Sequence, residues 1–324
     1  MFYALATALC LAVLFLVLVS SSILFFPAML LIRRMARASG LASSANLIFG
    51  VRLLPLFLTT IVALGLALPA FLEFEPYSTR EGMGIRLDVL AFAGALLLAV
   101  MIARGWRIVK ATSRAQRAWR ANSKKIHLQG IDLPIYRVTD GSSLLAVTGI
   151  FRPKIFLSDE IAAALSPQEL HAALTHEMAH VAALDNLKQM LLKITRPPRW
   201  LKAFYNVDAE WSGAAEIAAD SRTLARGASV VDLSSALIKV GRLSRGPATA
   251  GVIASHLIPP ACNSSLEQRI VRLSELLQSN QATTVRTGQS GMLIFAVFLG
   301  ITGYVACFHA LLPVVHEALE LLVR

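Results

Sequence analysis

Five consecutive residues, His176-Glu177-Met178-Ala179-His180, have the types and the spacing that a catalytic metal centre needs. On a helix, positions four apart lie on one face, so both imidazoles can bind a single metal ion. Glu177 then lies beside the metal, where its carboxylate can take a proton from a bound water. A chance match of this pattern is expected in about one chain per hundred of this length. The pattern therefore predicts a zinc site, which its surroundings must support.

A third protein ligand is expected, because catalytic zinc is held by three side chains and a water. The best candidate is Glu216, which is followed four residues later by Asp220 on the same helical face. From there the Asp220 carboxylate can accept a hydrogen bond from a ligand imidazole and fix the ring. Glu210 is the alternative ligand, but it has no carboxylate at the matching offset. A solvated acidic face would also explain these acids, yet the small residues between positions 214 and 219 favour packing against another helix.

Local signals independently place the two histidines on a helix. Ser166 is a good N-cap, Pro167 suits the first helical position, and Glu169 completes a capping box. Asp185 follows the motif where this helix should end, so it either braces the site or caps the turn. Apolar residues recur at helical spacing, namely Leu170, Ala173, Leu174, Met178 and Val181.

Together these residues predict metal-assisted peptide hydrolysis. One Zn2+ per chain, held by His176, His180 and Glu216, would lower the pKa of its water and polarise a peptide carbonyl. Glu177 would act as general base and then pass the proton to the leaving amine. No residue stands out as the donor that stabilises the oxyanion. We also expect a strand at 154–157 to lie along the cleft and pair with an extended substrate.

Four long apolar stretches predict helices that cross a membrane. The 324 residues are 56% hydrophobic with a mean hydropathy of +0.61, which is too apolar for an ordinary soluble protein. A span needs about 20 apolar residues. Charged residues are missing from 2–32, 53–72, 89–103 and 290–316. We therefore expect membrane helices at about 5–32, 53–72 and 87–104, and a fourth within 289–324.

The distribution of charge predicts the orientation of these spans. All charged residues between the first two spans are basic. After the third span, eight Lys and Arg residues occur up to position 125, without an acidic residue among them. Basic segments beside spans stay in the cytoplasm. We therefore expect a multi-pass membrane protein in which the region after the third span is cytoplasmic and both termini lie outside. The basic residues between the first two spans are Arg33, Arg34, Arg37 and Arg52.

The net charge of +11 mostly reflects this orientation signal. The basic run from 104 to 125 follows the third span directly, so it suits the headgroups of the lipid bilayer. No reader of nucleic acid is evident, and direct binding of nucleic acid is not expected. The three cysteines, Cys10, Cys262 and Cys307, are far apart in the sequence, and no structural disulfide is expected.

The pattern of elements predicts three regions: a membrane region at 1–109, a cytoplasmic domain at 110–288, and a fourth span with a short outer tail at 289–324. The domain should be α+β, inserted into an α-helical multi-pass membrane protein. Turn signals separate its strands, and helical periodicity surrounds the motif helix. The expected strands are 135–138, 144–148 and 154–157, and the further helices are 208–226, 231–243 and 266–277.

Several segments resemble the BlaR/MecR-type membrane zinc metallopeptidases, the antibiotic-sensor and signal-transducer peptidase family. The resemblance is most specific between 148 and 220, and the order of three spans, a zinc domain and a fourth span is also similar. The similar segments are Thr148–Ser158, Leu165–Leu170, the motif with Val181, Asp185-Asn186-Leu187, and Glu216-Ile217-Ala218-Ala219-Asp220.

This resemblance implies a zincin-like endopeptidase with a gluzincin-type third ligand, in the inner (plasma) membrane of a bacterium. It also implies a signalling role, in which the enzyme cleaves a cytoplasmic protein, such as a transcriptional repressor, or itself. The antibiotic sensors carry a penicillin-binding domain after the fourth span, whereas only about ten residues follow that span here. Sensing of β-lactams is therefore not expected. The signal would come from a sensor partner protein or through the outer loop at 73–86.

Two other interpretations stay open. A membrane quality-control or processing peptidase of the HtpX or CAAX type uses a similar HExxH and a later glutamate, but generally places its spans differently. A receptor or scaffold with a non-catalytic zinc domain is the second alternative. The presence of every expected ligand and of the general base argues against it.

Overall fold

The computed structural model describes residues 2–28, 31, 45–76, 84–128, 130–139, 144–197, 202–243, 254–256, 263–279 and 288–323. The chain divides into two compact units. We call the first the membrane unit, which comprises Met1–Met35, Ile48–Ala103 and Arg286–Arg324. We call the second the sheet unit, which comprises Ala36–Leu47 and Arg104–Val285.

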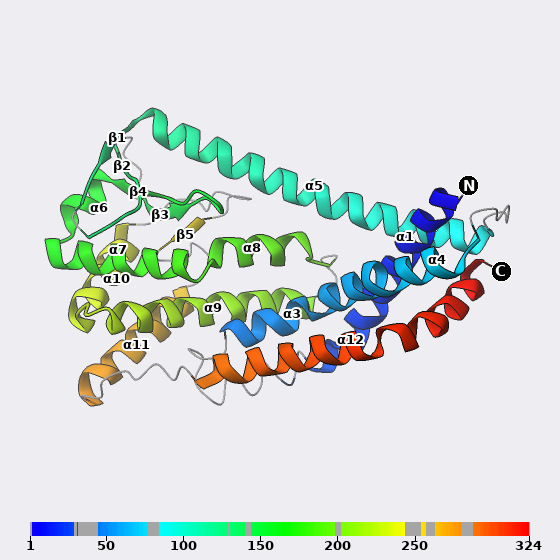
Figure 1. The fold of residues 1–324 in the computed structure, drawn as a ribbon. Coiled ribbons are helices and arrows are strands. Elements are labelled where there is room, and N and C mark those ends of the chain that lie inside the picture. The colour runs from blue at the N-terminus through cyan, green and yellow to red at the C-terminus, as the bar shows by residue number, and fades with distance from the viewer. Residues whose placement is uncertain are drawn as a thin grey trace. The chain divides into compact units, whose positions relative to one another are not determined.

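In the described part of the chain, four helices are long and apolar enough to cross a membrane: Phe2–Leu24, Ala45–Phe74, Ile85–Ala121 and Thr302–Val323. Each overlaps one of the predicted spans (Figure 1). The first predicted span runs to residue 32, but its helix ends at Leu24, and part of 25–32 lies outside the described residues. These helices are α1 (Phe2–Leu24), the run of α3 (Ala45–Thr60), the π-helix η2 (Ile61–Ala67) and α4 (Leu68–Phe74), then α5 (Ile85–Ala121), and most of α12 (Gly288–Val323).

The sheet unit contains a five-stranded sheet, in which the strand order is β1-β2-β4-β3-β5. β2 and β4 are parallel, and the other pairs are antiparallel. The predicted strands at 135–138, 144–148 and 154–157 are confirmed as β2, β3 and β4, whereas β1 and β5 were not predicted. The strands are β1 (Ser123–Ile126), β2 (Ile135–Val138), β3 (Leu145–Thr148), β4 (Lys154–Ser158) and β5 (Ala254–His256).

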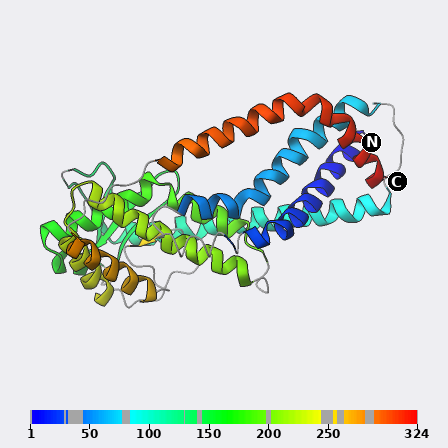
Figure 2. The ribbon, with the colours of Figure 1, turned by 90° about the horizontal axis from the view of Figure 1, so that it is seen from below.

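Helices pack on this sheet and carry the motif. α7 packs against both α9 and α10, and α10 packs against α11; Figures 1 and 2 show these helices side by side. Their apolar faces join the strands in one core, in which Ile155, Leu157, Leu174, Leu237 and Leu273 are buried. The helices are α6 (Asp159–Ala164), α7 (Pro167–Ala182), α8 (Asp185–Ile194), α9 (Lys202–Ala225), α10 (Val230–Leu243) and α11 (Asn263–Ser279).

The prediction that the strand at 154–157 pairs with a substrate is wrong. β4 lies inside the sheet, and β2 and β3 take the hydrogen bonds of its two edges. An added strand needs a free edge. The outer edge of β3 is instead the one that receives a short strand, because β5 pairs there from Ala254 to His256.

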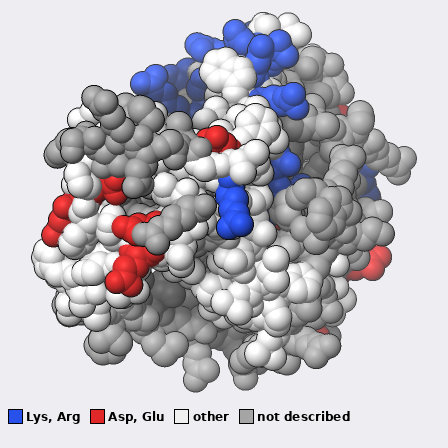
Figure 3. Space-filling view, turned by 90° about the vertical axis from the view of Figure 1, so that its right-hand side faces the viewer, with Lys and Arg blue, Asp and Glu red and all other residues white. Residues whose placement is uncertain are grey.

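The part of α5 that belongs to the sheet unit exposes a band of basic side chains. Lys and Arg gather at the upper edge of Figure 3, where α5 lies. The helix continues without a break from the third apolar stretch to Ala121. The exposed residues are Arg107, Lys110, Arg114, Arg117 and Arg120.

Candidate metal centre

The motif helix begins with a complete capping box. The Ser166 hydroxyl accepts from the backbone N–H of Glu169, and the Glu169 carboxylate accepts from the backbone N–H of Ser166 at 2.7 Å. Lys239 on α10 also donates to Glu169 at 2.7 Å, which ties the start of α7 to α10. Burial disfavours the Glu169 carboxylate, but the hydrogen bonds from Lys239, from Ser235 and from the Ser166 backbone outweigh burial and hold its pKa at about 2. The cap predicted from the sequence therefore also anchors α7 within the unit.

Both motif histidines are buried and turn the same ring nitrogen towards one point. The Nε2 atoms of His176 and His180 lie 3.1 Å apart. Each Nδ1 faces a carboxylate: Asp220 Oδ1 lies 3.0 Å from His176 Nδ1, and Asp185 Oδ2 lies 2.8 Å from His180 Nδ1. A carboxylate only accepts hydrogen bonds, so the contact with Asp185 keeps a proton on His180 Nδ1 and leaves Nε2 as the atom that can bind a metal. His176 Nδ1 faces Asp220 at ion-pair distance.

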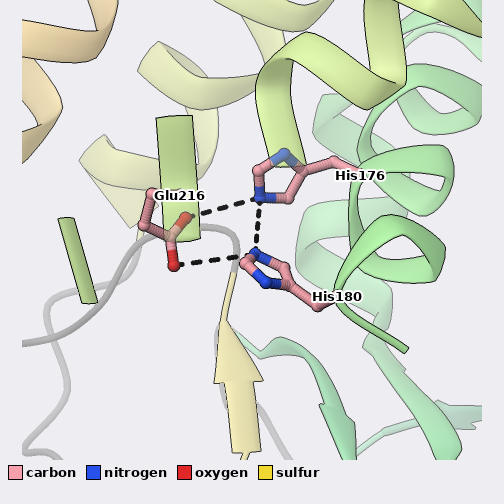
Figure 4. Close-up of side chains that lie close together, drawn as sticks. All are labelled: His176, His180 and Glu216. Carbon is pink, nitrogen blue, oxygen red and sulfur yellow. Dashed lines mark hydrogen bonds and ion pairs between the residues drawn. The ribbon is translucent and has the colours of Figure 1, made fainter. Parts of the chain in front are cut away.

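Glu216 on α9 completes the group. Its Oε2 lies 3.4 Å from His176 Nε2, and its Oε1 lies 3.6 Å from His180 Nε2 (Figure 4). One ligand atom from each of the three residues lies within 4.8 Å of the others, and all three side chains are buried. The structure thus brings together the three ligands predicted from the sequence. The alternative ligand Glu210 is not in this group.

The donor set fits a small divalent cation. Two imidazole lone pairs and a carboxylate converge in a buried space, and three electron-rich groups repel one another there unless a cation lies between them. Two histidines and one carboxylate are a common ligand set of catalytic zinc, which keeps one position open for water. The geometry therefore fits Zn2+, held by His176, His180 and Glu216.

The local electrostatics agree with this interpretation. Burial disfavours the charged imidazolium, but the charge of Glu216 and the hydrogen bond to Asp185 outweigh burial and raise the pKa of His180 to about 10. Burial also disfavours the Glu216 carboxylate, but His180 and Arg269 hold its pKa well below the usual range. The surroundings of His180 thus favour a positive charge, which a bound cation would supply in place of a second imidazole proton.

A sharp turn brings Asp185 back to His180. α7 ends at Ala182 and α8 starts at Asp185, and Leu184 between them has a left-handed backbone with φ 57°. A leucine seldom adopts this conformation, which costs roughly 1–2 kcal/mol. The turn lets the carboxylate hydrogen-bond to a ring only five residues earlier. Lys188 lies 3.5 Å from the other Asp185 oxygen. The sequence left two roles open for Asp185, supporting the metal site or capping the turn. The hydrogen bond to His180 favours support of the metal site.

Arg269 on α11 is a member of this site that was not predicted. Only 2% of the Arg269 surface is exposed to solvent. Its guanidinium donates two hydrogen bonds to Asp220, from Nε at 2.8 Å and from Nη2 at 2.7 Å. Its Nη1 lies 3.0 Å from Glu216 Oε2. Arg269 falls in the apolar stripe of its helix, four residues before buried Leu273. A charged residue in such a stripe was the signal that could have revealed it.

Glu177 is fully buried on α7 between the two histidines in sequence. Its negative charge is among the causes that raise the pKa of His180, so it lies close to the group. His171, five residues before His176, is exposed, as expected for a position off the ligand face. The role of Glu177 as general base stays a prediction.

Comparison with known proteins adds one match. The family described as BlaR1 peptidase M56 matches residues 74–273, which is more than half of the chain and contains the whole metal centre. No curated protein matches the chain.

Proposed function

Because the chain belongs to the BlaR1 peptidase M56 family of membrane metallopeptidases, we propose that it is a zinc endopeptidase that cleaves a cytoplasmic protein in signal transduction. The observation that carries the proposal is the convergence of His176, His180 and Glu216 around one point, next to the HExxH glutamate. In this proposal the sheet unit is a zincin-like domain, and its third ligand is of the gluzincin type.

Each side chain of the site has a separate role in the proposed reaction. A zinc ion bound by the three ligands would supply an activated water and polarise the scissile carbonyl. Glu177 takes the proton of that water and hands it to the leaving amine. Asp220 and Asp185 keep the Nδ1 proton on each imidazole, so that both Nε2 atoms stay available as ligands.

The position of β5, on the outer edge of β3, is the proposed place of an extended substrate, which would pair with β3 in place of β5. β5 pairs antiparallel with β3 there and also contacts α7 and α8, close to His180 (Figure 4). Pairing with a sheet edge supplies main-chain hydrogen bonds that do not depend on the substrate's sequence. Since the strand at this edge is the chain's own Ala254–His256, this segment is a candidate for self-cleavage.

The cellular setting is proposed from the helices and the charges. The four apolar helices suggest a membrane protein, and the basic segments at 33–52 and 104–125 favour a cytoplasmic sheet unit with both termini outside. The location is then the inner membrane of a bacterium, and the basic band of α5 contacts lipid headgroups. The partners are a protein substrate, such as a transcriptional repressor, and a sensor protein that supplies the signal.

The test compares new protein N-termini in cells that express the wild-type chain, Glu177→Gln or Glu216→Ala. Removal of the general base should lower cleavage about 10²- to 10⁴-fold while zinc stays bound. Loss of the ligand should lower both cleavage and zinc content. Retained cleavage in Glu177→Gln would exclude it as the base, and an unchanged zinc content in Glu216→Ala would exclude it as a ligand.

The identity of the cleaved proteins separates the functions that share this chemistry. New termini in a DNA-binding repressor, or near residues 254–256, would support signalling. New termini in many damaged membrane proteins would instead indicate quality control.

A further inference from the structure

Among the side chains that the structure describes, Arg269 is the most deeply buried charged group near the metal centre outside the motif itself. It comes from α11, a different helix from those of His176, His180 and Glu216, and reaches the site through the apolar face of that helix. Its guanidinium contacts two carboxylates at once: two nitrogens face Asp220 at 2.7 and 2.8 Å, and a third lies 3.0 Å from Glu216.

These two carboxylates are the ones that the metal centre needs in a fixed place. Asp220 holds His176, and Glu216 is the candidate third ligand. Arg269 binds Glu216 at Oε2, while Oε1 of the same carboxylate faces His180. The planar guanidinium offers fixed donors in a fork, so it determines the direction of both carboxylates and not only their charge.

We propose that Arg269 is a positioning residue for the metal centre. It holds Glu216 and Asp220 in the arrangement that a metal ion needs, so that the ligands are in place before the ion binds. The inference rests on the proposed zinc function.

Two physical effects of Arg269 on metal affinity have opposite signs, and this makes the proposal testable. As a positive charge, Arg269 repels a cation, so its removal would strengthen zinc binding. As a positioning group, it removes the cost of arranging two buried carboxylates, so its removal would weaken zinc binding. The proposal is that the second effect is the larger.

The experiment measures zinc affinity by competition with a chelator, using the purified full-length chain in detergent micelles. Arg269→Met keeps most of the volume and removes the charge and the fork. We expect its affinity for Zn2+ to fall about 10- to 100-fold, as for other groups that orient metal ligands. Arg269→Lys keeps the charge but lacks the fork, so it should restore only a small part of the affinity.

Arg272→Met is the matched control. Arg272 lies on the same helix, is half-buried, and faces Ser221 at 3.4 Å. Its replacement should leave zinc affinity within about threefold of wild type, since it holds no metal ligand. If Arg269→Met yields too little folded protein, Arg269→Lys decides the question by itself.

The readout separates positioning from a purely structural role. If Arg269 only stabilised the fold, its loss would lower the unfolding temperature of metal-free and zinc-loaded protein alike and leave the affinity of the folded protein unchanged. Unchanged or tighter zinc binding in the Arg269 variants would therefore overturn the inference. A wild-type chain that binds no zinc would instead overturn the proposed function, and the inference with it.

Discussion

The two histidines of the metal centre are held in different ways. On the His180 side, the supporting residues Asp185 and Lys188 follow within eight positions in the sequence. On the His176 side, Asp220 comes from α9 and Arg269 from α11, so three separate helices meet. We call these the local arm and the remote arm of the site.

The two arms also differ in how deeply their positively charged residues are buried. Arg269 is fully buried and makes a two-point contact with Asp220, whereas the Lys188 side chain is 17% exposed and lies 3.5 Å from Asp185. Water weakens a partly exposed ion pair, but a buried charge that loses its partner is costly. The remote arm should therefore affect both metal binding and folding, and the local arm mainly metal binding.

Asp220→Asn should have the largest effect, because it breaks the remote arm at its centre. The change removes the negative charge that makes a two-point contact with Arg269, and loss of a partner from a buried pair costs on the order of 3 kcal/mol of unfolding free energy. Zinc affinity should fall about 100-fold, at the upper end for a group that orients a ligand. Denaturant titration and chelator competition measure the two quantities, and a loss of affinity without a loss of stability would contradict the comparison.

Asp185→Asn should have a smaller effect on the local arm. An asparagine oxygen can still accept from His180 Nδ1, so only the charge is lost. We expect zinc affinity to fall about tenfold and the free energy of unfolding by about 1 kcal/mol. The same two titrations provide the measurement. An effect on stability equal to that of Asp220→Asn would show that the arms do not differ.

Leu184→Gly should have the smallest effect and the opposite sign. Leucine is strained at φ 57°, and its side chain is 57% exposed, so little packing is lost. Relief of this strain should raise the free energy of unfolding by about 0.5–1 kcal/mol, since glycine adopts this backbone freely. Cleavage activity should not change. A loss of stability in thermal unfolding would mean that the side chain packs against something in the folded protein.

Much of the site was predictable because its signals are local. The N-cap at Ser166, the spacing of the two histidines and the offset between Glu216 and Asp220 are each contained in a few residues, and the structure has them on α7 and α9. The three strands between 135 and 158 were predictable for the same reason, since turn residues separate them.

The parts that were missed depend on packing between distant segments. Arg269 lies 49 positions after Asp220, and no short-range pattern connects them. β5 is only three residues long and is a strand because β3 offers an edge. The placement of a substrate on β4 failed for this reason too, because strand order is a tertiary property.

The spread of the remote arm along the chain has a consequence for biosynthesis. Residues are added at about 5–20 per second, so roughly 4–18 seconds separate the synthesis of His180 from that of Arg269. During this interval the two histidines exist without the helix that completes their surroundings. We therefore expect stable zinc loading only after α11 has left the ribosome. Zinc bound by ribosome-attached chains, arrested before and after α11, would measure the difference.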